Sequence, residues 1–414
     1  MLDAPKQVPL PRVIRQNGGG ACNPPPFNYQ PQENSKMTSE IKCLYSGVDN
    51  LEVAFMGALN AEGLAALETA KERAQTDMLP ALIWLGKTEC SVAETGAKGG
   101  YAYRLDTGDD GETWFVKHSV NRKEWNLRVS VKAKALVLYG YEGVKARIYE
   151  RLEAVGATVM QESIGRVDLC VDLMLPGFEL QPENIISPAQ STQSDHGDMN
   201  VHRRARRVDS ITLGKMPGRQ ICIYNKRREA KIKRNLHWFD VWGLDRDENS
   251  SENPVWRVEI RAGKRYLSEQ LNVKTWAELD AVLPDFVKMT MEAYRIIGIK
   301  TGQNVSRWAT HEFWHEAHSR LMAITNGELC GIVPGRIVSG KRRVLQETYE
   351  TLIVGLAASL SEVCQTDDVP TLAQTLAQKI NNAALNQSDW NRRRQRAKRR
   401  LSITDEFYQQ EHHA

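Results

Sequence analysis

The sequence of 414 residues contains no long apolar segment. A membrane-spanning helix needs about 18 or more consecutive apolar residues, and the longest candidate, residues 352–360, has about half that length. The N-terminus also lacks the apolar stretch behind a basic start that a secretory signal requires. We therefore expect no membrane partner and a cytoplasmic location.

Cysteine is scarce and scattered along the chain. Disulfide frameworks and zinc sites place cysteines at close, regular spacings, but this chain has no CxxC pair and an odd number of cysteines. The seven are Cys22, Cys43, Cys90, Cys170, Cys222, Cys330 and Cys364. We therefore expect free thiols in a reducing compartment.

Three common catalytic motifs are also missing. The chain has no GxxxxGK[ST], which excludes a built-in P-loop motor such as a helicase. It has no GxGxxG behind a strand pattern and no GxSxG, so neither a dinucleotide-binding loop nor a hydrolase nucleophile elbow is expected.

Composition divides the chain into four segments. Residues 1–38 hold seven of the 16 prolines and a run of three glycines, which is typical of a disordered tail. Residues 39–300 mix strand and helix patterns, residues 301–390 are mainly helical, and residues 391–414 form a basic tail. We predict an α+β fold: a catalytic antiparallel sheet domain with helices on one face, followed by an α-helical C-terminal domain.

Two local signals place elements within this outline. Segments 210–215 and 219–226 flank Met216, Pro217 and Gly218, and a Pro-Gly pair predicts the turn of a β-hairpin. Thr275 precedes an amphipathic segment with Glu278 three positions later, which predicts a capping box at the start of a helix.

The segment 166–175 alternates strictly between polar and apolar residues. Its odd-numbered positions, from Val167 to Leu175, are apolar and predict the core face of a strand. Asp168 and Asp172 point to the opposite face with Arg166. Carboxylates are disfavoured in strands, so this face is either solvated or functional.

Two further strands repeat the pattern. Segment 255–262 directs Arg257, Glu259 and Arg261 to one face, and the second hairpin strand directs Tyr224 and Lys226 the same way. If the three strands share a sheet, one polar face collects these side chains with the two aspartates.

This combination of residue types suggests phosphoryl chemistry. Asp168, Asp172 and Glu259 are oxygen ligands of the kind that Mg²⁺ or Mn²⁺ prefers. Tyr224 is a candidate covalent nucleophile, because nearby positive charge helps a phenol to ionise. Lys226 and Arg257 complete the predicted catalytic set. The chemistry that fits is transesterification at a DNA phosphodiester, whereas the simpler alternative for Tyr224 is an ordinary strand aromatic.

The net charge of +4 hides a strong segregation. Residues 201–234 hold twelve basic and two acidic residues, and residues 391–400 hold seven basic ones, which leaves −13 for the rest. A clustered positive charge is typical of nucleic-acid binding, and arginine suits phosphate; a solvated charged surface is the alternative. The predicted DNA contacts are Arg203, Arg204, Arg206, Arg207, Lys215, Arg219, Arg227, Arg228, Lys231, Lys233 and Arg234.

The ordered set of strands resembles the replication initiation factor family. These proteins are rolling-circle replication initiators of bacterial plasmids and filamentous phages, with relatives among conjugative-element relaxases. The resemblance covers residues 45–267 and rests on GRVDLCVDL (165–173), LGKMPGRQICIYNK (213–226) and VWRVEIRAGKRYL (255–267).

The resemblance implies a role for each matched residue. Tyr224 would be the nicking tyrosine that becomes joined to a 5′ phosphate. Asp168, Asp172 and Glu259 would be metal ligands or acid–base groups, and Arg166, Arg257 and Lys226 would hold phosphate or orient the carboxylates. The fallback nucleophiles are Tyr139, Tyr141 and Tyr266.

The resemblance also implies partners. The substrate would be single-stranded or hairpin origin DNA inside a bacterial host cell, and a host helicase and DNA polymerase would continue replication. A homodimer is one option for the oligomeric state.

Two other functions stay open. A non-catalytic DNA-binding regulator of a plasmid or phage would use the same basic segment, but it would not need carboxylates beside phosphate. Residues 311–315, HEFWH, fit the HExxH pattern of zinc metalloproteases, in which His311 and His315 share one helix face and Glu312 acts as base. Such a site needs a third ligand, and we favour a chance match within a structural helix.

Overall fold

The computed structural model describes residues 41–85, 88–187, 199–204, 207–246, 253–302, 304–328, 334–366 and 368–400. The predicted tail of residues 1–38, together with Cys22, Arg206 and Cys330, lies outside these ranges. The described cysteines are all free thiols, as expected.

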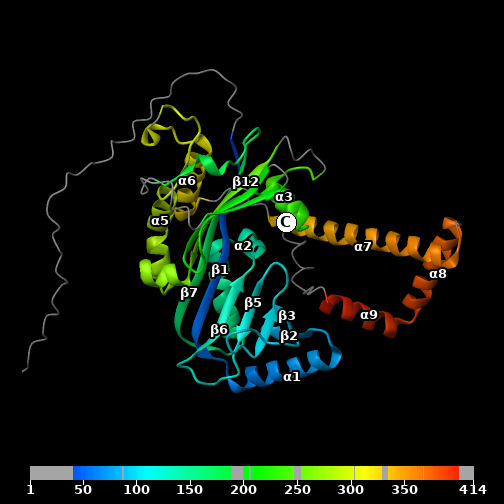
Figure 1. Cartoon of the computed structure of the whole chain (residues 1–414). Helices are drawn as coiled ribbons and strands as arrows, with labels where there is room; N and C mark the ends of the chain where they lie inside the picture. The colour runs from blue at the N-terminus through cyan, green and yellow to red at the C-terminus, as the bar shows by residue number, and fades with distance from the viewer. Residues whose placement is uncertain are drawn as a thin grey trace, which may run out of the picture. The chain divides into compact units, whose positions relative to one another are not determined.

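Strands dominate the first two thirds of the described chain and helices the last third (Figure 1). The strands are β1 Lys42–Ala58, β2 Ala81–Leu85, β3 Thr88–Val92, β4 Tyr103–Asp106, β5 Glu112–Val116, β6 Trp125–Val131, β7 Thr158–Met174, β8 Ile185–Ile186, β9 Met199–Arg204, β10 Arg207–Gly214, β11 Arg219–Asn225, β12 Val255–Gly263 and β13 Arg295–Ile296. The helices are α1 Ala61–Asp77, α2 Ala133–Ala154, α3 Lys226–Ile232, α4 His237–Trp242, α5 Trp276–Glu292, α6 Glu312–Thr325, α7 Pro334–Cys364, α8 Val369–Leu385 and α9 Gln387–Arg400. Short helical turns are η1 Pro182–Asn184, η2 Tyr266–Gln270 and η3 Val305–Arg307.

The described strands form one eleven-stranded sheet in the order β2-β3-β4-β5-β6-β1-β7-β12-β11-β10-β9, and β8 pairs with β13 separately. Every pairing in the large sheet is antiparallel. Strands β1 and β7 lie side by side along their whole length at the centre (Figure 1). They approach so closely that a Cβ atom at Gly57 would lie 2.1 Å from the carbonyl oxygen of Thr158, which explains the glycine.

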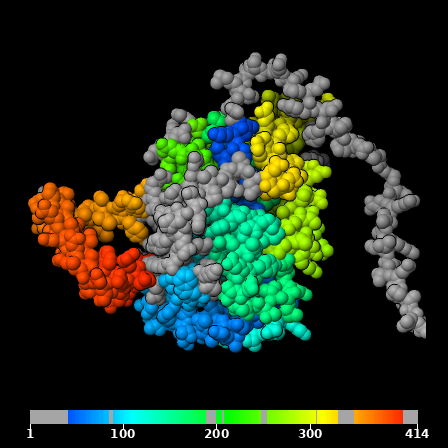
Figure 2. Space-filling model, turned by 180° about the vertical axis from the view of Figure 1, so that it is seen from behind, coloured from blue at the N-terminus to red at the C-terminus, as the bar shows by residue number. Residues whose placement is uncertain are grey.

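The main core lies on one face of the sheet. The alternating residues of β7, among them Val167, Leu169 and Val171, point into it, as the sequence pattern predicts. Phe286 of α5 and Phe313 of α6 cover them. The surface in Figure 2 shows α1 (blue) and the residues that follow it up to about 150 (teal) as one continuous body. This agrees with the shared core of α1, α2 and the sheet.

A second, smaller core lies on the opposite face. Trp238 and Trp242 of α4 pack there with Tyr45, Cys170 and Val255 from the central strands. The predicted α+β class, antiparallel sheet and helical C-terminal region are confirmed. Helices cover both faces rather than the single face expected, because the polar strand face carries enough aromatic and aliphatic neighbours to bury α4.

The two local signals are also confirmed. The hairpin pairs β10 with β11, so that Ile211 lies opposite Ile223. The side chain of Thr275 accepts from the backbone N–H of Glu278, and Glu278 accepts from the backbone N–H of Thr275, which together form the capping box of α5.

The C-terminal helices α7–α9 differ from the rest because their described side chains are mostly exposed. Leu356 on α7 is 70% exposed and Leu385 on α8 is 80% exposed. No helix in the described ranges is long and apolar enough to cross a membrane. The domain boundaries stay a prediction, but α6 shares the core of the sheet, because its Phe313, Trp314 and Leu321 are buried there.

Phe313→Ala tests that α6 belongs to the sheet's core. Phe313 is fully buried and stacks on Phe178 with ring centroids 4.7 Å apart. We expect its truncation to lower the free energy of unfolding by about 3–5 kcal/mol. Leu356→Ala, at an exposed position of α7, should change it by less than about 0.5 kcal/mol. Urea unfolding followed by circular dichroism measures both, and equal effects of the two variants would contradict this packing.

Candidate active site

Three neighbouring strands bring most of the predicted polar residues to one face; Lys226, predicted on the second hairpin strand, instead begins α3, because β11 ends at Asn225. In the register of β7 and β12, Arg257 lies opposite Asp172 and Arg261 lies opposite Asp168. In the register of β11 and β12, Tyr224 lies opposite Arg257. The expectation that the three strands share a sheet is therefore confirmed, and their polar side chains face away from the main core.

An ion pair between Arg257 and Asp172 lies at the centre of this face. Both side chains are fully buried, and Arg257 donates Nε to one carboxylate oxygen at 2.6 Å and Nη2 to the other at 2.7 Å. Its Nη1 donates to Asp49 of β1 at 2.7 Å, and the indole N–H of Trp242 donates to Asp172 at 2.8 Å. The pair is thus satisfied on both sides, which a buried charge requires.

Aromatic and cationic side chains close this part of the face. The guanidinium of Arg257 lies 4.1 Å from the ring centroid of Trp238, and the ammonium of Lys226 lies 5.1 Å from the same ring. Lys226 is buried, forms an ion pair with Glu229 at 2.8 Å and lies 5.5 Å from the ring centroid of Tyr224. The two predicted catalytic cations therefore lie beside the tyrosine, but both are already paired with carboxylates.

A second ionic cluster lies along the same strands and reaches solvent. Arg166 donates Nε to Asp168 at 2.9 Å, and Arg261 donates Nε to Glu259 at 2.7 Å. The side chains of Arg166 and Arg261 are 25% and 26% exposed, whereas the two carboxylates are buried. Burial, and secondarily the charge of Glu259, raises the pKa of Asp168 to about 7, although Arg166 opposes the shift.

Tyr224 joins the second cluster through its hydroxyl group. The phenol donates a hydrogen bond to Glu259 at 3.1 Å. Burial, followed by the negative charge of Glu259, raises the pKa of Tyr224 well above its usual value, and Arg257 only partly compensates. Our expectation that nearby positive charge favours the phenolate is therefore wrong for this arrangement. The phenol is protonated and hydrogen-bonded to a carboxylate, which is the geometry of a nucleophile beside a general base.

The three carboxylates predicted to bind metal do not converge. Asp172 belongs to the buried pair, whereas Asp168 and Glu259 belong to the cluster near solvent, and each is engaged by an arginine. Within the described ranges, no group of three or more His, Cys, Asp or Glu side chains is arranged to hold a metal ion. As arranged, these residues do not fit a three-carboxylate Mg²⁺ or Mn²⁺ site, and metal binding stays a prediction.

The basic segment divides into exposed and internal residues. Arg203, Arg204, Arg207, Lys215, Lys233 and Arg234 are exposed, on β9, β10 and the ends of the hairpin and of α3. Arg227 is fully buried and donates to the carbonyls of Asn253 and Asp245 at 2.8 and 3.1 Å, so it is not placed to contact DNA. Arg219 is half-buried and donates to the carbonyl of Met289 at 3.0 Å.

Arg228 and Lys231 take an intermediate place in this segment. Arg228 donates to Asp209 at 2.8 Å, and Lys231 lies half-buried with its ammonium 5.8 Å from the ring centroid of Phe239. Both would have to leave or share these contacts in order to bind phosphate.

The fallback tyrosines lie away from the carboxylate face. Tyr141 donates to Asp280 of α5 at 2.7 Å. The ring of Tyr139 lies under the guanidinium of Arg147, and the buried hydroxyl of Tyr266 has no hydrogen-bond partner in the described part of the chain. Tyr224 is thus the candidate nucleophile that the geometry favours.

The HEFWH segment does not form the helix of a zinc protease. His311 is the N-cap of α6, outside the helix, and its Nδ1 accepts from the backbone N–H of Phe313 at 3.0 Å. His311 also packs on Phe178, and burial lowers its pKa. Since His311 caps the helix, His311 and His315 do not both lie on one face within it, as the zinc pattern requires. The HExxH match here marks the start of a helix.

Two residues of the site, Asp49 and Trp242, were not singled out from the sequence. They come from segments distant in the chain and carry no local signal. Arg261 was placed on the polar face by the strand period, but no role was assigned to it.

Comparisons with known proteins add little to this geometry. No protein-family model and no curated protein matches the chain. Among solved structures, the chain is similar to a rolling circle replication initiator protein from Geobacillus stearothermophilus, with a TM-score of 0.35 and 14% sequence identity over 68% of this chain and 97% of that chain. A TM-score this low does not establish a shared fold, so function has to be argued from this chain's own residues.

Asp168→Asn should remove a pH-dependent part of the stability. The pKa of Asp168 is raised in the folded chain to about 7 from 3.8, so its contribution is fully present below pH 3.8 and is lost as the pH rises through about 7. The free energy of unfolding of the wild type, relative to the variant, should therefore fall across this interval. Urea unfolding at a series of pH values measures it, with the exposed Glu72→Gln as control. A difference that stays constant with pH would contradict the raised pKa.

Proposed function

We propose that the chain is a site-specific DNA nickase and strand transferase that initiates rolling-circle replication. The hydrogen bond from Tyr224 to Glu259 carries this proposal, because it pairs a candidate nucleophile with a proton acceptor. The resemblance of the three strand segments to replication initiation factors supports the same reaction.

In this proposal Glu259 takes the phenolic proton as the oxygen of Tyr224 attacks phosphorus. A bond forms between the tyrosine oxygen and phosphorus, and the bond from phosphorus to the 3′ oxygen breaks. The 3′ oxygen leaves and takes a proton from water. The products are a 5′-phosphotyrosyl protein and a free 3′-OH, which a host DNA polymerase would extend while a host helicase unwinds the duplex.

Arg166 and Arg261 are the cations best placed for the reacting phosphate. Each lies beside a carboxylate of the second cluster and is partly exposed, whereas Arg257 and Lys226 are buried. Positive charge at this point would stabilise the negative charge that develops on the phosphate oxygens. Arg257 is instead a positioning residue, because its donors are taken up by Asp172 and Asp49.

Dependence on Mg²⁺ or Mn²⁺ remains part of the proposal without a defined site. A divalent cation would neutralise charge on the phosphate, but the carboxylates as arranged do not form its ligand set. No step above therefore passes through a metal, and the assay below includes metal-free conditions.

The exposed arginines and lysines of the hairpin region would bind the backbone of single-stranded or hairpin origin DNA. Phosphate contacts of this kind fix position and carry no sequence information. Reading of the origin sequence, and assembly as a homodimer, are further parts of the proposal that need their own tests.

A non-catalytic DNA-binding regulator is the second candidate. One observation favours it: each predicted metal-binding carboxylate is already engaged by an arginine, as in a purely structural network. The covalent-capture assay described in the next paragraph separates the two functions.

Tyr224→Phe should abolish covalent capture of DNA, because it removes the attacking oxygen and keeps the ring. The substrate is a 3′-labelled single-stranded pool that covers the DNA flanking the gene, with Mn²⁺, Mg²⁺ or EDTA. Wild type should give a labelled protein band that survives denaturing electrophoresis. Glu259→Gln, which keeps the shape but not the base, should slow capture by roughly 10²–10⁴-fold.

Tyr266→Phe is the matched control and should react like wild type. Equal capture by wild type and Tyr224→Phe would assign the nucleophile elsewhere. DNA binding without capture under every metal condition would support the regulator.

Arg203→Ala with Arg204→Ala should weaken DNA binding and reduce its salt dependence. Each lost phosphate contact lowers the slope of log K against log salt by roughly 0.7 for a single strand. The double variant should therefore lose about 1.4 from the slope, measured by fluorescence anisotropy between low and high salt. The exposed pair Arg122→Ala with Lys123→Ala, in the turn before β6, is the matched control. An unchanged slope for the Arg203 and Arg204 double variant would show that β9 does not contact the DNA backbone.

A further inference from the structure

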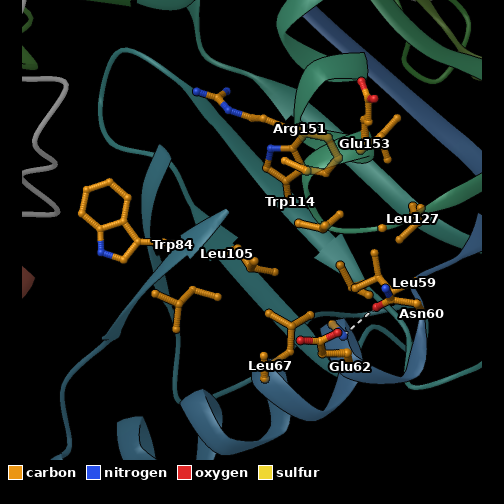
Figure 3. A pocket seen from close by; sticks show the side chains of 18 residues that line it. Leu59, Asn60, Glu62, Leu67, Trp84, Leu105, Trp114, Leu127, Arg151 and Glu153 are labelled. Atoms are coloured by element: carbon orange, nitrogen blue, oxygen red, sulfur yellow. Dashed lines mark hydrogen bonds between the residues drawn. The ribbon is translucent and has the colours of Figure 1, made fainter. Parts of the chain in front are cut away.

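The cavity in the half of the sheet away from Tyr224 is not suited to an anion. It has a volume of about 400 Å³ and a mainly apolar wall that includes Leu67 and Leu105 (Figure 3). Among the described residues, Arg151 is the cation that lines it, and its guanidinium forms an ion pair with the buried Glu112. Positive charge gathers instead around the end of β12.

Four cations lie close together in the sequence at the end of β12. They are Arg261, Lys264, Arg265 and Lys274, and the chain between the first and the last of them holds one carboxylate, Glu269. The last three of these cations, here called the Lys264 cluster, are exposed. They are therefore accessible to a ligand from solvent.

The ammonium of Lys264 is held by neutral oxygens. It donates to the hydroxyl of Ser163 and, at 3.2 Å, to the carbonyl of Ile164. In the described part of the chain, no carboxylate forms an ion pair with Lys264 or Lys274. Its contacts thus fix the position of the Lys264 ammonium without neutralising its charge.

Lys274 lies beside the same stretch of β7. The backbone N–H of Ile164 donates to the carbonyl of Lys274 at 2.8 Å, so both lysines meet at one residue. Burial, followed by the charge of Lys274, lowers the pKa of Lys264. Two like charges near each other produce a positive potential that a bound anion would relieve.

Arg265 extends this charge to the hairpin turn. Its Nη2 lies 3.4 Å from the position that a Cβ atom would take at Gly218. The backbone N–H of Gly218 donates to the carbonyl of Lys215, whose exposed side chain is one of the predicted DNA contacts. The Lys264 cluster is therefore continuous with the basic hairpin.

The cluster is also continuous with the candidate active site. Arg166 lies opposite Gly263 in the register of β7 and β12, directly beside Lys264. Arg261, on the same strand, donates to Glu259. Lys264 follows Glu259 by five residues, which is roughly 16 Å along an extended chain. A single strand of DNA spans such a distance in a few nucleotides.

Tyr224 lies between this cluster and the arginines of β9. In the strand register, Tyr224 lies opposite Ser210, and Ser210 lies opposite His202. Arg203 and Arg204 continue from His202 away from the hairpin turn, whereas the Lys264 cluster lies toward the turn. One strand that passes Tyr224 can therefore meet cations on both sides of it.

We propose that Lys264, Arg265 and Lys274 bind the phosphate backbone of single-stranded DNA on the hairpin-turn side of Tyr224. Lysine binds phosphate as a point charge, and cations spread over this length match a chain of phosphates better than one small anion. The inference rests on the proposed substrate, a single DNA strand, and not on the nicking reaction.

The salt dependence of DNA binding tests this contact. The titration uses a fluorescein-labelled single-stranded oligonucleotide and the full chain with Tyr224→Phe, so that no covalent product forms. Adding Lys264→Ala and Lys274→Ala should lower the slope of log K against log salt by about 1.4, because each lost phosphate contact removes roughly 0.7. Lys264→Arg with Lys274→Arg should keep the parental slope. Lys98→Ala with Lys123→Ala removes the same charge from exposed positions in the other half of the sheet and should keep it too.

A further pair of variants guards against effects on folding. Lys264→Gln with Lys274→Gln retains a donor for Ser163, should melt near the parental temperature, and should lose the same slope as the alanine pair. An unchanged slope in the alanine and glutamine pairs, or an equal fall in the arginine or control pair, would overturn the proposal. Binding by wild type without covalent capture would contradict the nickase and leave this contact standing.

Discussion

The buried ion pair between Arg257 and Asp172 is the constraint on which the polar face of the sheet depends. Two opposite charges in a dry interior are tolerated only when every donor and acceptor is satisfied, and the loss of one partner leaves an uncompensated charge. Asp49 from β1 and Trp242 from α4 supply the remaining contacts. The pair therefore ties three strands and one helix together, and it fixes where β11, and with it Tyr224, can lie.

This constraint separates two kinds of polar residue that look alike in the sequence. Asp172 and Arg257 are fully buried and hold the scaffold, whereas Arg166 and Arg261 reach solvent beside buried carboxylates. Tyr224 lies between the two groups, opposite Arg257 in register and hydrogen-bonded to Glu259. In the proposed reaction, this position would give Tyr224 both a rigid support and access for a substrate, which is what precise positioning in catalysis requires.

Period-two patterns and turn residues were enough to predict the central strands, the hairpin and the shared polar face, because side-chain alternation and Pro-Gly turns are local properties. Contacts between segments far apart in the chain could not be predicted in this way. Because these contacts were missing from the prediction, the predicted roles of Asp172 and Tyr224 differ from those that the structure supports. The sequence alone does not show that Trp242 and the Asp49-bound Arg257 engage Asp172, so it predicts a metal ligand there. It also does not show that Tyr224 is buried, so its cationic neighbours predict a phenolate. His311 shows the same limit, since only the position of the helix start distinguishes a cap from a ligand.

The long strands β1 and β7 form a seam between two sub-sheets. Strands β2 to β6 lie on one side of the seam, and β12, β11, β10 and β9 lie on the other side with Tyr224. The two sub-sheets share no other strand, so within the sheet a change in one half is transmitted to the other only through these two strands. A substitution in this seam, such as at Gly57, where a Cβ atom has no room against Thr158, would therefore disturb the strand pairing that joins the two halves.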